Sequence, residues 1–248
     1  MEKRGTLVIA LALFLGIVLG AYVLGKSILR FRIDDRSISV KGFSEREVKA
    51  DFAIWSLKVR TASNDLQEGS RALGVAKTKV YEFLTKNGVN PKEIIQKDLS
   101  VTDLEAREYR PENASANRYI IEETMEVRST NVDLVQKVSR MTSDLLNAGV
   151  ALSSKEDFNA LRFIFTKLND IKPAMLSEAT KNARKAAEEF TKESGTSLGK
   201  MRQATQGLFS IVDRDASLSG QADGGYYSGS ADVYKKVRVV ISVEYSIN

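Results

Sequence analysis

VKADFAIWSLKVRT, residues 48–61, is the stretch that decides the fold of this chain. Polar and apolar residues alternate along it, as they do in a β-strand. One face carries Ala50, Phe52 and Ile54, and the other carries Ala53, Trp55, Leu57 and Val59. Because a strand with two apolar faces is covered on both, we expect helices of the same chain over one face. We expect another subunit to be a candidate cover for the second face. Trp55 is expected to be an ordinary core residue, with burial against a subunit as the alternative.

The sequence on either side of this strand predicts two similar strand–helix–strand units, at about residues 37–104 and 118–248. In the first unit we expect a strand, a hairpin turn, the strand above, a helix and a strand, at residues 37–42, 44–47, 48–61, 64–86 and 94–104. In the second we expect strands at residues 118–128, 157–168, 206–213 and 233–247, and helices at 130–147 and 171–194. Residues 105–117 and 216–232 are expected to be loops. The fold class is therefore α+β, with long antiparallel or mixed strands.

The ends and buried faces of the helices can also be predicted. The first helix begins at NDLQ (residues 64–67) and ends at Asn87 and Gly88, and Gly149 and Gly195 end the other two. The expected buried faces are Leu66, Leu73, Ala76, Val80, Phe83 and Leu84; then Val135, Val138, Met141 and Leu145; then Met175, Ala179, Ala183, Ala186 and Phe190. Alanine on the last face permits close contact with a sheet or a second helix. Gly69 and Gly74 each cost the first helix about 1 kcal/mol, which is tolerable where a neighbouring backbone approaches closely.

The N-terminal stretch LVIALALFLGIVLGAYVLG, residues 7–25, contains no charge and no proline. As a helix it would be about 28 Å long, close to the hydrocarbon thickness of a bilayer. We expect an uncleaved transmembrane anchor at residues 1–26, a stalk at 27–36 and an exported domain at 37–248. The alternatives are a cleaved signal peptide and a buried core helix. Basic residues flank both ends of the stretch, so charge does not decide its orientation. We place the short N-terminal tail inside, because the large domain is the part to export. The protein is then a single-pass protein of the inner membrane with a periplasmic domain.

Composition excludes several classes of chemistry. Among 248 residues there is no cysteine and no histidine, so disulfides, thiolate nucleophiles and Ser-His-Asp triads cannot form. The formal net charge of +5 is too small and too dispersed for a nucleic-acid surface. We therefore expect a protein that is not an enzyme, with no cofactor, no metal and no nucleic-acid partner.

Three segments are similar to the SIMPL-domain family of bacterial envelope proteins, which includes an oxidative-stress defence protein and a periplasmic immunogenic protein. They are ISVKG with VKADFA (residues 38–42 and 48–53), ATKNARKAAE (179–188) and GTSLGK (195–200). The sequence departs from the family at Ser44, where a second glycine is common, and at Ala50, where a proline often precedes Asp51. The resemblance covers residues 37–248 and implies no agreed activity and no catalytic residues. One relative is a ring-like, channel-shaped homo-oligomer, so the resemblance implies self-assembly.

Four groups of residues were weighed as sites. Ser197 and Lys200 match the Ser-x-x-Lys pair of penicillin-recognising enzymes, but that class also needs Ser-Asp-Asn and Lys-Thr-Gly elements, and both are absent from the sequence. The acidic pairs Glu122-Glu123 and Glu188-Glu189 are expected to be solvated because adjacent residues point in different directions. The segment 220–229 is either a surface connection or a contact in which Tyr226 and Tyr227 meet a neighbouring subunit. The sequon at Asn113 is taken as chance.

These observations predict a non-enzymatic, membrane-anchored envelope protein. We expect it to assemble into a ring-like or channel-like homo-oligomer that supports envelope or oxidative-stress tolerance. Its partners are membrane lipid at residues 7–25, further copies of itself and an envelope protein. The alternatives are a module that binds a peptide or an envelope protein along a sheet edge, and a hydrolase of the Ser/Lys type.

Overall fold

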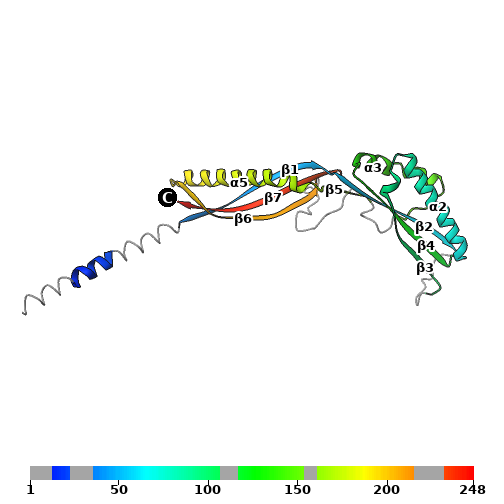
Figure 1. The fold of residues 1–248 in the computed structure, drawn as a ribbon, viewed down its shortest axis with the longest axis horizontal. Helices are drawn as coiled ribbons and strands as arrows, with labels where there is room; N and C mark the ends of the chain where they lie inside the picture. Colours follow the sequence, from blue (N-terminus) through cyan, green and yellow to red (C-terminus); the bar gives the residue numbers. More distant parts are fainter. Residues whose placement is uncertain (1–12, 23–35, 107–116, 154–160, 215–231) are drawn as a thin grey trace, which may run out of the picture. The chain divides into compact units, whose positions relative to one another are not determined.

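The computed structural model describes residues 13–22, 36–106, 117–153, 161–214 and 232–248. Within these ranges the chain is an α+β protein with two antiparallel sheets (Figure 1). The strands are β1 (Ser37–Lys49), β2 (Phe52–Ser63), β3 (Ile94–Asp103), β4 (Tyr119–Ser129), β5 (Leu161–Ile164), β6 (Leu198–Asp213) and β7 (Tyr234–Ile247). The helices are α2 (Leu66–Lys86), a 3-10 turn at Pro91–Glu93, α3 (Val132–Ser139), α4 (Ser143–Asn147) and α5 (Leu168–Glu193). The α+β class is therefore confirmed.

One sheet has the strand order β3-β4-β2-β5. In it β2 pairs antiparallel with β4, so that Trp55 lies opposite Val127, and with β5, so that Trp55 lies opposite Leu161. The alternation expected for β2 is confirmed, because Ala53, Trp55, Leu57 and Val59 are all buried. Helices α2 and α3 pack against this sheet and close a hydrophobic core that contains Trp55. Trp55 is thus a core residue of its own chain.

The other sheet has the order β1-β7-β6, and α5 lies along it (Figure 1). The strand β7 alternates strictly, with Val239, Ile241, Val243 and Tyr245 buried. The buried face of α5 consists of Met175, Ala179, Ala183, Ala187 and Thr191. Alanine and glycine allow the two elements to touch: a Cβ on Gly42 of β1 would lie 2.1 Å from the carbonyl oxygen of Ala179.

The chain divides into two compact units. One contains residues 1–44, 172–209 and 238–248, and the other contains residues 45–171 and 210–237. These limits differ from the consecutive units expected at about residues 37–104 and 118–248. Each unit combines segments that are far apart in the sequence, because β1, β6 and β7 pair over long sequence separations.

The hairpin expected at residues 44–47 is wrong. β1 continues through this segment to Lys49, and β1 and β2 belong to different sheets. The chain changes sheet at Ala50, whose N–H donates to the carbonyl oxygen of Val233, and at Asp51, whose N–H donates to that of Ile164. These two long-range bonds mark the point at which the chain passes from one sheet to the other.

Three further boundaries and two buried faces differ from the sequence expectations. The helix expected at residues 130–147 is two helices, α3 and α4, and the strand expected at 157–168 is described only as β5 and gives way to α5 at Leu168. β6 begins at Leu198 instead of residue 206. On α5 the buried positions are Ala187 and Thr191, not Ala186 and Phe190. On α2 Leu66 is exposed, whereas Leu73, Ala76, Val80 and Leu84 are buried as expected.

The N-terminal stretch is described only at residues 13–22, which are helical and exposed throughout. The remainder of the anchor expected at residues 7–25 lies outside the described ranges. No helix within those ranges combines the length and the apolar character that crossing a bilayer requires.

Candidate functional site

Ser197 and Lys200 are not arranged as a catalytic pair. Ser197 lies just before β6, and its backbone N–H and C=O pair with Asn248 at 3.1 and 3.0 Å. Lys200 lies within β6, where its backbone N–H donates to the Oγ of Ser246. Residues three apart in an extended chain point to opposite faces. The two side chains therefore belong to the end of a sheet and lack the nucleophile–base contact that covalent catalysis uses.

The acidic pair on β4 is split between the two faces of the sheet. The Nε of Arg60 lies 3.3 Å from an oxygen of Glu122, and the Nζ of Lys77 lies 2.7 Å from an oxygen of Glu123. Each carboxylate thus has its own cation. The pair does not converge on a shared ligand.

The acidic pair on α5 is separated in the same way. Glu188 accepts a hydrogen bond of 2.8 Å from Arg184 one turn earlier, and Glu189 is exposed. In the part of the chain that the structure describes, no three His, Cys, Asp or Glu side chains are grouped so that they could hold a metal ion. Residues 220–229, with Tyr226 and Tyr227, and the sequon at Asn113 lie outside the described residues.

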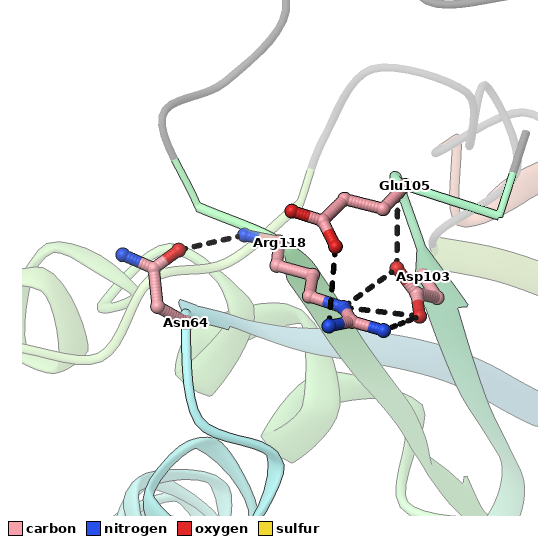
Figure 2. Close-up of polar contacts among 4 residues, drawn as sticks. All are labelled: Asn64, Asp103, Glu105 and Arg118. Carbon is pink, nitrogen blue, oxygen red and sulfur yellow. Dashed lines mark hydrogen bonds and ion pairs between the residues drawn. The ribbon is translucent and has the colours of Figure 1, made fainter.

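A polar cluster around Arg118 joins the ends of β3 and β4. Figure 2 shows the guanidinium of Arg118 between the carboxylates of Asp103 and Glu105. Its Nε lies 3.2 Å from both Asp103 oxygens and its Nη2 lies 2.9 Å from Oδ2, while Nη1 lies 3.1 Å from Glu105. The backbone N–H of Arg118 donates to the Oδ1 of Asn64 at 2.9 Å. The cluster therefore fixes both ends of the connection between the strands.

In the Arg118 cluster, the hydrogen-bonded groups stabilise each other's charged forms. Hydrogen bonds from Arg118 hold the pKa of Asp103 below its ordinary value, and the same bonds raise the pKa of Arg118. Both groups consequently stay charged at neutral pH, so neither is prepared to exchange a proton with a substrate. Exposed pairs of this kind contribute little to stability, and we assign the cluster a local positioning role.

A second charged cluster lies where β6 and β7 meet the connection between them. The ammonium of Lys235 donates to Asp213, and the two side chains are only 5% and 9% exposed. The surrounding ion pairs are Arg214–Glu47, Arg214–Asp232 and Lys236–Glu45. Every acid in this cluster faces a cation. The arrangement compensates the burial of Lys235 and Asp213 and leaves no carboxylate directed at a ligand.

The strand β6 is different, because most of it is exposed. It is the edge of its sheet, and all residues from 200 to 208 are exposed; we call this stretch the β6 edge. Leu208 is 88% exposed and Met201 is 46% exposed. An edge strand presents backbone N–H and C=O groups that its own sheet does not pair. The β6 edge therefore offers another strand both hydrogen bonds and apolar side chains.

The other described edges have features that β6 lacks. β1, the opposite edge of the same sheet, carries five charged residues among its 13 (SISVKGFSEREVK). The exposed edge strand β3 has an irregularity between Gln96 and Leu99, and the charged residues Lys97 and Asp98 lie inside it. The edge strand β5 has only four residues. Bulges, charges and short length are the usual protection against edge pairing. In β6, residues 203–208 (QATQGL) carry no charge at all.

The sequence offers no direct signal for this edge. Residues 198–205 (LGKMRQAT) show no sustained alternation of apolar and polar residues, so no strand was predicted there. A strand that is exposed on both faces has no apolar face to produce such a pattern. The lack of an alternating pattern in residues 198–205 and the lack of core contacts in β6 therefore have the same cause, the exposure of both faces of the strand.

Within the described residues, the fold and these surfaces define a class of protein. It is an α+β protein of two antiparallel sheets, in which the charged clusters consist of paired acids and cations and the long edge strand β6 is unprotected. The chain belongs to the SIMPL family, whose description is "Protein of unknown function (DUF541)" and which matches residues 38–245. None of the curated proteins matches the chain. The resemblance inferred from the sequence is thus confirmed, and the family's description gives no function.

Proposed function

We propose that this protein is a non-enzymatic, membrane-anchored envelope protein that assembles with copies of itself. Residues 7–25 hold it in the inner membrane, and the α+β part lies in the periplasm. The assembly is ring-like or channel-like and supports tolerance of envelope or oxidative stress. The observation that carries the proposal is the β6 edge, an unprotected strand in a chain whose other described edges are interrupted, short or charged.

The apolar N-terminal helix supports the tether. Residues 13–22 (LFLGIVLGAY) are helical, and every one of them is exposed. A helix that is apolar all round is normally covered, and lipid is the cover that fits a long, uncharged apolar stretch. Tethering confines the copies to a plane and raises their effective concentration. A modest contact between sheet edges is then enough for assembly.

The test is the mass of the purified full-length chain in detergent, measured by light scattering and by sedimentation. We expect a discrete oligomer at micromolar concentration, and particle images that show a closed arrangement. A monomer under these conditions overturns the self-assembly proposal.

A second candidate is a binding module that receives an extended peptide along the same edge. Lys200 and Arg202 favour this alternative, because two cations at the start of the β6 edge suit an acidic peptide. The same mass measurement separates the two candidates: a binding module is monomeric and gains mass only when an acidic extended peptide is added.

A further inference from the structure

We propose that the β6 edge pairs with the β6 edge of a second copy. The two strands run antiparallel about a two-fold axis perpendicular to the sheet, so that two three-stranded sheets become one of six strands. This inference rests on the self-assembly proposed above and names the element and the geometry of one contact. Because a two-fold contact closes at two copies, it forms a dimer, and the proposed ring needs a second contact between dimers.

Backbone hydrogen bonding is the first argument. Among the residues that the structure describes, the sheet order β1-β7-β6 leaves one side of β6 without a neighbouring strand. Nine consecutive residues, 200–208, are exposed there, and the last of them, Leu208, is 88% exposed. A partner strand would satisfy the backbone groups of the edge and cover Leu208 and Met201 at the same time.

Charge decides the orientation of the two copies. Lys200 and Arg202 lie at one end of the stretch, and residues 198–212 contain no acidic residue. Arg202 also has Glu244 of β7 within 4.0 Å, so the repulsion rests chiefly on Lys200. In a parallel, in-register pair each cation would lie opposite its own copy, which is destabilising. In an antiparallel pair centred on Ala204, the two Lys200 side chains lie about 26 Å apart along the strand. That separation exceeds the Debye length of about 8 Å at physiological ionic strength.

The two-fold axis also fixes which residues meet. Opposed residues in such a pair point to the same face of the joined sheet, so their numbers differ by an even amount. Centring the contact on Ala204 places Leu208 opposite Lys200, and centring it on Thr205 places Leu208 opposite Arg202. The register centred on Ala204 pairs the whole β6 edge, and in it, as in the register centred on Thr205, Leu208 faces a cation of the other copy.

This geometry gives a matched pair of variants. Leu208→Lys places like charges opposite each other twice in every pair, and we expect the dissociation constant to rise by about tenfold. Leu208→Glu places opposite charges there, and we expect association as tight as that of the original chain or tighter. Because Leu208 is almost fully exposed, both variants should keep the circular dichroism of the original protein.

Cysteine crosslinking tests the orientation independently, and the chain contains no cysteine of its own. Opposed Cα atoms in an antiparallel pair lie about 4.5–5.5 Å apart, within the range of a disulfide. Ala204→Cys or Thr205→Cys should therefore crosslink to itself on oxidation. Arg202→Cys and Leu208→Cys should not, because neither residue lies opposite its own copy. In a parallel, in-register pair all four would crosslink.

The experiment uses the purified full-length chain in detergent. Weaker association of Leu208→Lys alone, with crosslinks only at position 204 or 205, supports the proposal. An oligomer that neither charge variant affects, and in which neither midpoint cysteine crosslinks, overturns the inference about β6 and leaves self-assembly standing. Crosslinks at all four positions overturn the antiparallel geometry. A monomeric original chain overturns self-assembly itself, and this inference with it.

Discussion

Gly42 in β1 lies so close to α5 that there is no room for a side chain. A Cβ at this position would lie 2.1 Å from the carbonyl oxygen of Ala179 and 2.5 Å from the amide nitrogen of Ala183. Both are helix backbone atoms, which cannot turn aside as a flexible side chain does. We expect Gly42→Ala to lower the free energy of unfolding by about 2–3 kcal/mol, measured by urea unfolding of the full chain.

The same substitution at Gly74 in α2 is the control. Nothing lies within 4 Å of a Cβ at Gly74, and alanine favours a helix over glycine by about 0.5–1 kcal/mol. Gly74→Ala should therefore stabilise the chain, or at least leave it unchanged. A Gly42→Ala variant as stable as the original would contradict the close approach of β1 and α5.

From the geometry of the Arg118 cluster we predict that replacing Arg118 changes the pKa of one carboxyl group, that of Asp103. Arg118 lowers the pKa of Asp103, chiefly through its hydrogen bonds. The stabilisation that follows is present above the unfolded-state pKa of about 4 and is lost as the pH falls through the lower folded-state value. In Arg118→Ala the pKa of Asp103 should return toward its ordinary value, which an NMR titration of the carboxyl carbon measures.

Glu105→Gln is the matched control for this measurement. It removes the contact between Glu105 and Nη1 of Arg118 and leaves the bonds from Nε and Nη2 to Asp103 in place. The pKa of Asp103 should therefore stay low in this variant. If Arg118→Ala also leaves it low, another group is responsible for the shift.

At the scale of elements, the buried face of α5 differs by one residue from the expected face at two positions. Its buried positions recur every four residues, from Met175 to Thr191, whereas the sequence pattern suggested Ala186 and Phe190. We expect Ala187→Leu to destabilise the chain by about 1–3 kcal/mol, because it overfills the contact with the sheet. Ala186→Leu should change stability by no more than about 0.5 kcal/mol. Equal effects in urea unfolding would contradict the observed face.

The sequence predicted the elements that local signals specify. The helix α2 was predicted to within two residues at its start and at its last residue, because Asp65 caps it by accepting from the N–H of Glu68 and Asn87 ends it. The strands expected at residues 94–104 and 118–128 agree with β3 and β4 to within one residue at each end. The close backbone expected beside Gly69 and Gly74 is not found: a Cβ at Gly69 would lie 2.8 Å from the side chain of Ile121, and nothing lies within 4 Å of one at Gly74.

Long-range bonds were what the sequence could not predict. Ser44 was assigned to a turn, yet its Oγ donates to Glu178 of α5 at 2.9 Å and β1 continues past it. Asp51 accepts from the N–H and the hydroxyl of Thr166 at 2.7 and 2.8 Å, across 115 residues. Local propensity carries no information about such partners. The candidate site was missed for the related reason that β6 has no core face to reveal it.

At the scale of the whole molecule, the tether proposed at residues 7–25 can be tested without shortening the chain. Leu15 and Val18 lie near the middle of this stretch, one helical turn apart. Each arginine at the centre of a spanning helix costs about 2.5–3.5 kcal/mol, so Leu15→Arg combined with Val18→Arg should prevent stable insertion. We expect an alkaline carbonate wash of membranes to release the double variant and to leave the original chain in the pellet.

The control is Leu15→Phe combined with Val18→Leu, which keeps the stretch apolar and should stay in the membrane. Release of the original chain by the same wash would overturn the anchor, and a mature chain that begins after Lys26 would replace it with a cleaved signal peptide. The released double variant also tests the role of the membrane in assembly. If confinement to a plane raises the effective concentration of the β6 edges, this variant should dissociate on dilution at concentrations where the original chain in vesicles still crosslinks through Ala204→Cys or Thr205→Cys.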